Sequence, residues 1–250
     1  MAEADRLRWN ERYAVREAAA EDLTPVRRLL QFEALLRPTA PAAPKSAAGP
    51  PLEPDVVGAP GRSNRSSVVG EPGLPAPSLR SGQALSAVEG SLPKGRTSAG
   101  RRRTSPLALD LACGLGRHAL YLARLGYTVD AWDVSDVALD HLARAARDQG
   151  LAARIRPRQV DLDAAALPAH HYDLVVDTYF LDRRLFGPMQ AALKPGGLLF
   201  VETLLATPQK PGRPDYYLQA GELRAAFPAL TELFYQENTD DGWAALLARR

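Results

Sequence analysis

The sequence has little of several residue types, and each shortage argues against a class of protein. One cysteine in 250 residues has no partner within the chain for a disulfide, which fits the reducing cytoplasm. No apolar run reaches the roughly 18 residues that a membrane-spanning helix needs. The N-terminus carries acidic residues and lacks the apolar stretch of a secretion signal. We therefore expect a cytoplasmic protein with no membrane partner.

Aromatic residues are missing between Pro38 and Pro106, a stretch that holds 12 of the 21 prolines and 9 of the 19 glycines. Such a segment has almost nothing to bury, whereas ordering its backbone costs roughly 1–2 kcal/mol per residue. We expect residues 38–105 to be a disordered insertion between an N-terminal helical segment, 1–37, and one domain, 106–250. Deleting residues 40–100 should then leave folding and activity nearly intact.

The basic charge of the chain is concentrated in the same proline-rich segment. The segment holds 9 Lys and Arg against 4 Asp and Glu, a net charge of +5, so the formal +2 of the whole chain leaves −3 on the rest. The sequence pI of 8.8 therefore does not indicate nucleic-acid binding by the folded part. We expect no nucleic acid among the partners.

One stretch has the pattern of a nucleotide-binding turn. An apolar run at 107–111 predicts a buried strand, Gly114 and Gly116 predict a tight turn, and residues 117–125 continue at helical spacing. Free N–H groups at the start of such a helix attract the polar part of a ligand. A second strand, 128–132, is followed by Asp133, which lies 17 positions after Gly116, near where a ribose-binding acid is expected.

Asp110 discriminates between two classes of cofactor. Gly114, Gly116 and Ala119 satisfy the G-x-G-x-x-A pattern of dinucleotide binding, which alone is weak evidence. A carboxylate at the end of the first strand would repel a pyrophosphate, whereas it would attract a ligand with an amino group, such as S-adenosylmethionine. Purely structural roles remain open, because either Asp110 or Asp133 can cap a helix.

At this point the sequence resembles the class I S-adenosylmethionine-dependent methyltransferases. Their first motif is roughly acid-x-Gly-x-Gly-x-Gly, and this chain has Asp110-Leu-Ala112-Cys113-Gly114-Leu-Gly116, with alanine in place of the first glycine. Two further stretches resemble the tellurite-resistance and thiopurine-type branch, whose N-terminal segment closes over the substrate. They are Trp9-Asn-Glu-Arg12-Tyr13 and the Lys194-Pro-Gly-Gly197 sequence that precedes the fifth strand.

The resemblance implies a set of binding residues. Asp161 and the N–H of Leu162 would face the adenine ring, although a loop acid with no partner is an alternative for Asp161. The N-terminal segment would be a lid. The implied cofactor-binding residues are Asp110, Ala112, Cys113, Gly114, Gly116, Asp133, Val134, Asp161, Leu162 and Asp177. The implied lid residues that contact substrate are Trp9, Arg12 and Tyr13, although an ordinary amphipathic helix packed on the core is an equal alternative.

The order of the predicted elements indicates an α/β fold. Strands at 107–111, 128–132, 155–160, 172–177 and 197–203 alternate with helices, which predicts a parallel sheet. Strands at 230–236 and 243–248 flank a turn-rich link and predict an antiparallel hairpin. We therefore expect a Rossmann-like, doubly wound, mostly parallel seven-stranded sheet with a C-terminal antiparallel hairpin. Further helices are expected at 3–20, 25–37, 135–149, 185–193 and 219–227.

In such sheets ligands bind beyond the carboxyl ends of the strands. Asp177 or Tyr179, after the fourth strand, can serve as a general base if the methyl acceptor has a proton to lose. Tyr179 also has the position of a substrate contact. The loop at 206–217 holds Arg213 and Tyr216, which we expect to contact substrate, with a solvated connector as the alternative. His170 and His171 have no companions at ligand spacing, so no metal site is expected.

These observations favour an S-adenosylmethionine-dependent methyltransferase that acts on a small molecule. A non-catalytic regulator that binds the same cofactor is an alternative, and an NAD-dependent oxidoreductase is a weaker one. The sequence identifies neither the acceptor nor the oligomeric state.

Overall fold

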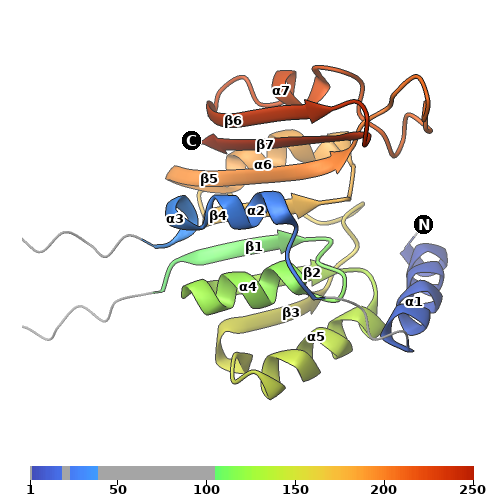
Figure 1. Ribbon diagram of the computed structural model, residues 1–250. Coiled ribbons are helices and arrows are strands. Elements are labelled where there is room, and N and C mark those ends of the chain that lie inside the picture. The colour runs from blue at the N-terminus through green and yellow to red at the C-terminus, as the bar shows by residue number, and fades with distance from the viewer. Residues whose placement is uncertain (1, 19–22, 39–104) are drawn as a thin grey trace, which may run out of the picture. The chain divides into compact units, whose positions relative to one another are not determined.

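The computed structural model describes residues 2–18, 23–38 and 105–250, so the predicted insertion at 38–105 lies outside the described residues except at its two ends. Within the described part, seven strands form one sheet in the order β3-β2-β1-β4-β5-β7-β6 (Figure 1). The predicted fold class is confirmed. The strands are β1 (Leu107–Leu111), β2 (Thr128–Asp133), β3 (Ile155–Gln159), β4 (Tyr172–Thr178), β5 (Leu193–Leu204), β6 (Thr231–Asn238) and β7 (Trp243–Arg249).

The first five strands are parallel, and β7 lies antiparallel between β5 and β6. The parallel strands therefore all end at one edge of the sheet, which we call the carboxyl edge. β3 and β6 form the two sides of the sheet, and β3 carries Pro157 at its centre. The predicted C-terminal hairpin is confirmed.

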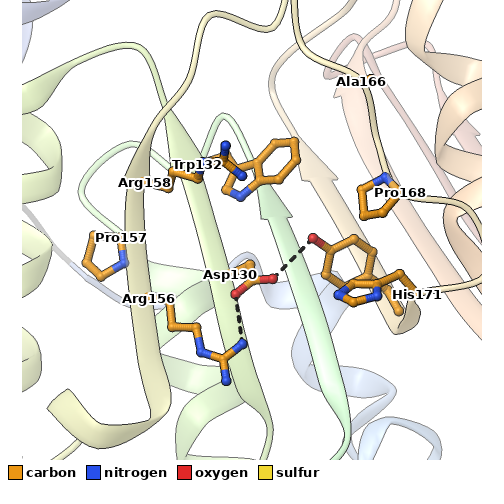
Figure 2. Close-up of a pocket in the computed structure, with 9 residues that line it drawn as sticks. Asp130, Trp132, Arg156, Pro157, Arg158, Ala166, Pro168 and His171 are labelled. Carbon is orange, nitrogen blue, oxygen red and sulfur yellow. Dashed lines mark hydrogen bonds and ion pairs between the residues drawn. The ribbon is translucent and has the colours of Figure 1, made fainter.

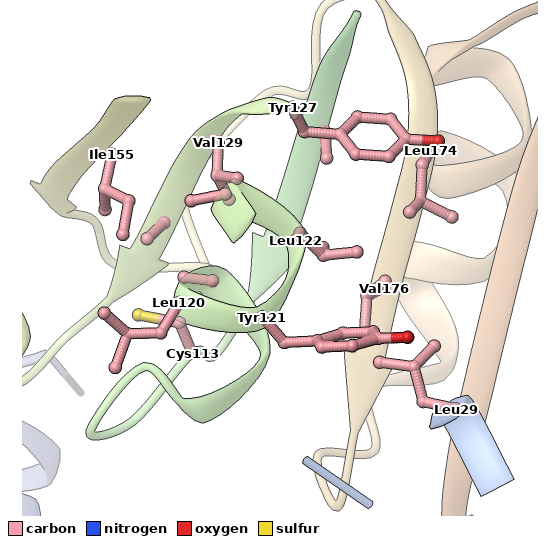
Figure 3. Packing of buried hydrophobic residues seen from close by; sticks show 14 of the residues in the cluster. Leu29, Cys113, Leu120, Tyr121, Leu122, Tyr127, Val129, Ile155, Leu174 and Val176 are labelled. Carbon is pink, nitrogen blue, oxygen red and sulfur yellow. The ribbon is translucent and has the colours of Figure 1, made fainter. Parts of the chain in front are cut away.

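Helices cover both faces of the sheet. One face packs against α2 (Arg27–Gln31), α3 (Glu33–Leu36), α4 (Arg117–Leu125) and α5 (Asp136–Asp148), and the other against α6 (Phe186–Ala192) and α7 (Glu222–Ala225). Because side chains alternate along a strand, Leu174 and Val176 of β4 enter the first core (Figure 3), whereas Val175 enters the second. The central strands are apolar on both sides for this reason.

The helix predicted at 25–37 is interrupted. It begins at Arg27 rather than Pro25, with Val26 at the N-cap position, and Phe32 leaves the helical conformation with φ −98° and ψ 12° between α2 and α3. The ring of Phe32 lies 4.9 Å from the ring of Phe234, on β6, and 6.3 Å from the ring of Phe200, on β5. These tertiary contacts outweigh the local helical pattern.

Two other predicted boundaries were wrong. The helix at 219–227 is reduced to the four residues of α7, since Gly221 precedes it with φ +77° and Pro228 follows soon after its end. The fifth strand begins at Leu193 instead of Gly197, because Leu193 pairs with Tyr172 ahead of an irregularity in the ladder. The N-terminal helix α1 (Ala2–Ala18) and helix α5 lie close to their predicted ranges.

None of the helices in the described ranges combines the length and the apolarity required to cross a membrane.

Candidate active site

The turn after β1 places three residues in the left-handed region of backbone conformation. Gly114 and Gly116 have φ +54° and +81°, as the sequence predicted, and Ala112 has φ +48°. A Cβ atom on Gly116 would lie 2.2 Å from Leu142 Cδ1, so only glycine lets α5 pack against the turn. A Cβ atom on Gly114 would lie 2.9 Å from the hydroxyl of Tyr13.

Ala112 occupies the position where the methyltransferase motif has its first glycine. A residue with a Cβ atom is disfavoured at φ +48° by about 1–2 kcal/mol. The alanine therefore keeps the glycine-like backbone of the motif at a cost in strain, and strain of this kind is concentrated at functional sites.

Asp133, at the end of β2, holds this turn by main-chain contacts. Its Oδ2 accepts a hydrogen bond of 2.8 Å from the N–H of Gly114, and its Oδ1 accepts one of 2.9 Å from the N–H of Ser135. The cap of α5 is Ser135, whose Oγ accepts from the N–H of Ala138. Asp133 thus has a structural role in addition to any contact with ribose, and each carboxylate oxygen retains a further lone pair for a ligand hydroxyl.

Asp110 and Asp177 lie at the carboxyl ends of the neighbouring strands β1 and β4, and their side chains are buried. Among the described residues, Asp110 Oδ2 and Asp177 Oδ1 have no hydrogen-bond partner. Burial raises the pKa of Asp110 to about 7, and burial together with the charge of Asp110 raises that of Asp177 well above its ordinary value. Since buried acceptors are nearly always paired, the two orphaned oxygens fit a cationic ligand group.

Arg117, the first residue of α4, adds a positive charge to this cluster. Its charge is one of the causes that lower the pKa of Asp110 against the effect of burial. Two neighbouring carboxylates, one of them within the electrostatic reach of a guanidinium, match a ligand that is a zwitterion, with an ammonium and a carboxylate on one carbon. The sequence reasoning missed Arg117, although its place directly after the glycine turn was a usable signal.

The remaining predicted cofactor residues surround the same edge. Cys113 is buried, and burial followed by the charge of Asp133 raises the pKa of its thiol, so it stays protonated and serves as a small packing residue. The carbonyl of Val134 accepts from Gln159 Nε2, and Asp161 Oδ1 accepts from the N–H of Asp163. Leu162 packs against the second core.

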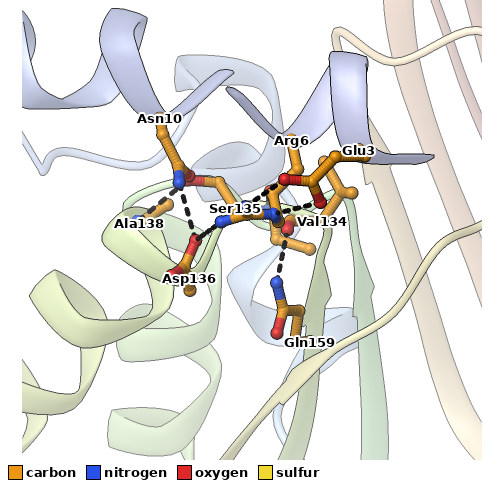
Figure 4. A network of polar contacts seen from close by, with 9 residues as sticks. Glu3, Arg6, Asn10, Val134, Ser135, Asp136, Ala138 and Gln159 are labelled. Carbon is orange, nitrogen blue, oxygen red and sulfur yellow. Dashed lines mark hydrogen bonds and ion pairs between the residues drawn. The ribbon is translucent and has the colours of Figure 1, made fainter. Parts of the chain in front are cut away.

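Helix α1 docks on the start of α5 through polar side chains, as Figure 4 shows. Asn10 donates to Asp136 Oδ1 at 2.7 Å, and its own Oδ1 accepts from Ser135 Oγ at 2.6 Å. Arg6 pairs with the same Asp136 carboxylate at 3.2 Å. These contacts attach α1 to Ser135 and Asp136, which closely follow Asp133 in the sequence, and Asp133 itself holds the glycine turn.

The three predicted lid residues lie together on α1. The rings of Trp9 and Tyr13 stack at 5.6 Å, and the guanidinium of Arg12 lies 5.0 Å from the centre of the Trp9 ring. Tyr13 is buried against Gly114 and packs in a small cluster with Leu115. The helix therefore contacts the glycine turn through Tyr13.

His118, the second residue of α4, joins the helix to two other parts of the chain. The residue is 2% exposed and bridges two segments: its Nε2 accepts from the N–H of Val26, and its Nδ1 lies 3.1 Å from Thr178 Oγ1. Burial lowers the pKa of His118 to about 3, so the ring is neutral. With Nε2 an acceptor, the network assigns the proton to Nδ1, which donates to Thr178.

Tyr179 lies two residues after Asp177, and its hydroxyl is hydrogen-bonded to a buried carboxylate. Its phenol donates to Glu202 Oε1 at 2.8 Å, and the guanidinium of Arg117 lies 5.7 Å from the centre of its ring. Burial, followed by the charge of Glu202, raises the pKa of the phenol. The geometry therefore keeps Tyr179 protonated, which favours a positioning role over that of a base.

The predicted substrate loop, 206–217, is held by contacts of its own. Arg213 and Tyr216 are exposed and contact each other, with the guanidinium 4.8 Å from the ring centre. Arg183, ahead of α6, holds the loop by donating to the carbonyls of Pro214 and Tyr217. Figure 1 shows the loop and α1 on the same side of the sheet, where the parallel strands end.

A groove of about 470 Å³ lies elsewhere on the sheet, beside β2 and β3 (Figure 2). Its polar groups satisfy one another: Asp130 accepts from the hydroxyl of Tyr172 and pairs with Arg156, while Arg158 lies 5.4 Å from the ring centre of Trp132. It contains none of the predicted site residues, so we place the candidate active site at the carboxyl edge. The groove is lined by Asp130, Trp132, Arg156, Pro157, Arg158, Ala166, Pro168, His171 and Tyr172.

Comparison with known proteins agrees with this geometry. The family described as TehB, tellurite resistance protein TehB, matches residues 99–243. A probable S-adenosyl-L-methionine-dependent methyltransferase TehB from Haemophilus influenzae strain 10810 is 32% identical over 110 residues, which cover 41% of this chain and 37% of that protein. A ubiquinone biosynthesis O-methyltransferase from Caulobacter vibrioides is 33% identical over 104 residues, 40% of this chain and 41% of that protein.

The crystal structure of TehB from Haemophilus influenzae has a similar fold. It aligns with a TM-score of 0.51 and 27% sequence identity, covering 59% of this chain and 58% of that one. The chain spans less than half the length of the curated relatives it matches.

Proposed function

Because the chain belongs to the TehB family of class I S-adenosylmethionine-dependent methyltransferases, we propose that it transfers a methyl group from S-adenosylmethionine to a small-molecule acceptor in the cytoplasm. The observation that carries this proposal is the pair of orphaned, buried oxygens on Asp110 and Asp177 at the carboxyl edge. They form a site for a cationic group next to a glycine turn.

The residues present fit this cofactor. Asp110 and Asp177 would receive the ammonium group, Arg117 the carboxylate, and Asp133 the ribose hydroxyls. Val134, Asp161 and Leu162 would border the adenine ring, while Ala112, Cys113, Gly114 and Gly116 supply backbone that a ligand can approach closely. Carboxylates in these places would repel a diphosphate, which argues against the NAD-dependent alternative.

When bound, the cofactor supplies a methyl group already activated by its sulfonium centre. The chain has to hold the acceptor in line and exclude water, and positioning of this kind is worth roughly 7–11 kcal/mol. Six side chains from three parts of the chain are proposed to contact the acceptor: Trp9, Arg12 and Tyr13 on α1, Tyr179 after β4, and Arg213 and Tyr216 in the loop. Asp177 is the remaining candidate for a base, and an acceptor that arrives as an anion needs none.

Calorimetry with the full chain tests the cofactor, and an activity assay tests the chemistry. We expect micromolar binding of S-adenosylhomocysteine and no binding of NADH; the reverse would establish the oxidoreductase alternative. Methyl transfer from labelled S-adenosylmethionine to tellurite or to 2-mercaptoethanol would exclude a non-catalytic regulator. Binding without transfer to either probe would leave the regulator as the better description.

A further inference from the structure

Glu202, near the end of β5, is a buried charge that the proposed cofactor contacts do not use. Its side chain is 1% exposed, and both of its oxygens accept from Arg28 of α2, at 2.9 and 2.8 Å. The guanidinium of Arg28 lies 3.3 Å from the ring centre of Trp243, at the start of β7. A fork of two parallel bonds and an aromatic face fix the arginine in one orientation.

Tyr179 is attached to Glu202 by both its main chain and its side chain. The N–H of Tyr179 donates to the carbonyl of Glu202 at 2.7 Å, and the phenol donates to Glu202 Oε1 at 2.8 Å. Tyr179 also has φ +58°, a left-handed conformation that a residue with a Cβ atom adopts only when its surroundings impose it. Both of these hydrogen bonds from Tyr179 go to Glu202.

The ring of Tyr179 nevertheless faces outward at the carboxyl edge. The residue is 47% exposed although its hydroxyl is engaged, and Arg117 approaches the ring at 5.7 Å. Tyr179 lies two residues after Asp177, whose Oδ1 has no partner among the described residues. The ring therefore presents a fixed aromatic surface beside the proposed cation site.

We propose that Glu202, held by Arg28, is a positioning residue that fixes the ring of Tyr179 as one wall of the acceptor side of the site. The inference rests on the proposed function for the identity of that site. It also gives the N-terminal segment a part in the site, because Arg28 belongs to α2 and the preceding Val26 is held by His118. Sequence reasoning could not pair Arg28 with Glu202, since 174 positions separate them.

The test replaces Glu202 by glutamine, which keeps the shape of the side chain and removes its charge. The chain offers a matched control in Glu33, which also pairs with an arginine, Arg37, and accepts from a tyrosine hydroxyl, that of Tyr121. Hydrogen exchange at the N–H of Tyr179, measured without ligand, should become roughly tenfold faster in Glu202→Gln and stay unchanged in Glu33→Gln.

The functional readout separates positioning of the acceptor from binding of the cofactor. In Glu202→Gln, the affinity for S-adenosylhomocysteine should stay within about twofold, while KM for the probe acceptor, tellurite or 2-mercaptoethanol, rises roughly tenfold as one charge-assisted hydrogen bond is lost. Tyr179→Phe removes only the hydroxyl and should also raise KM. This variant replaces Glu202→Gln as the test if Glu202→Gln does not fold.

The outcomes distinguish the inference from the proposed function. Unchanged exchange at Tyr179 in Glu202→Gln, or an unchanged KM in both variants, overturns the positioning role. If the wild-type chain binds no S-adenosylhomocysteine, or methylates neither probe, the proposed function fails, and the exchange comparison alone then decides whether Glu202 holds Tyr179.

Discussion

Replacing Asp110 by asparagine tests whether the carboxyl edge is built for a cation. Burial raises the pKa of Asp110 from the ordinary 3.8 to about 7, so the folded protein without ligand holds a proton that the unfolded chain releases. The pKa of Asp110 thus differs by about 3 units between the folded and the unfolded chain. At about 1.36 kcal/mol per unit, this difference corresponds to about 4 kcal/mol of unfolding free energy. This contribution of Asp110 to the unfolding free energy is fully present below pH 4, where both states are protonated, and is lost as the pH rises through about 7.

Thermal melting between pH 5 and pH 8 measures the effect. Over this window Asp110 alone should cost the unliganded wild-type chain about 2–3 kcal/mol of unfolding free energy, or about 4–12 °C in melting temperature for a domain of this size. Asp110→Asn has no proton to lose and should show a shallower slope, while Asp177 keeps its own contribution, which has the same sign. Asp140→Asn, on an exposed position of α5, is the matched control and should melt like the wild type at every pH.

Binding of S-adenosylhomocysteine should offset the loss of stability that ionisation of Asp110 causes. The ammonium of S-adenosylhomocysteine stabilises the ionised form of Asp110, so wild-type affinity should rise by about tenfold in all between pH 6 and pH 8 and level off above the pKa of about 7. Asp110→Asn should bind roughly ten- to a hundredfold more weakly at pH 8. A wild-type melting temperature independent of pH, or a variant with the wild-type slope and affinity, would refute the reasoning.

Three further substitutions test single features. Ala112→Gly should leave the free energy of unfolding unchanged or raise it by up to about 1 kcal/mol in urea denaturation, because relief of the left-handed alanine exceeds or offsets the added freedom of the unfolded chain. Asp133→Ala should weaken S-adenosylhomocysteine binding about ten- to a hundredfold in calorimetry; an unchanged affinity would mean that this carboxylate only holds Gly114 and Ser135. Phe200→Ala, in a fully buried position of β5, should cost about 3–5 kcal/mol of unfolding free energy in the same urea assay, and a loss under 1 kcal/mol would contradict the packing described.

The sequence predicted the features that local patterns determine. The glycine turn, the strand before it and the helix after it are encoded by neighbouring residues, so Gly114 and Gly116 could be placed in left-handed conformations without a structure. The order of strands and helices likewise implied a parallel sheet, and hence the edge at which Asp110 and Asp177 meet.

Features set by distant contacts could not be predicted in the same way. The helix at 25–37 breaks at Phe32 because that ring packs on β5 and β6, strands that come more than 160 residues later. His118 reads as a surface residue in its helix, and only the approach of Val26 and Thr178 makes it a buried bridge. Such roles depend on which segments the fold brings together.

Strand β3 has a consequence for how the folded chain meets its neighbours in solution. It forms one side of the sheet, where an unprotected backbone would be a template for pairing with another molecule. Pro157, at its centre, has no N–H to offer an incoming strand, and the exposed guanidinium groups of Arg156 and Arg158 flank it. This side of the molecule is therefore a poor template for edge-to-edge pairing with a second copy.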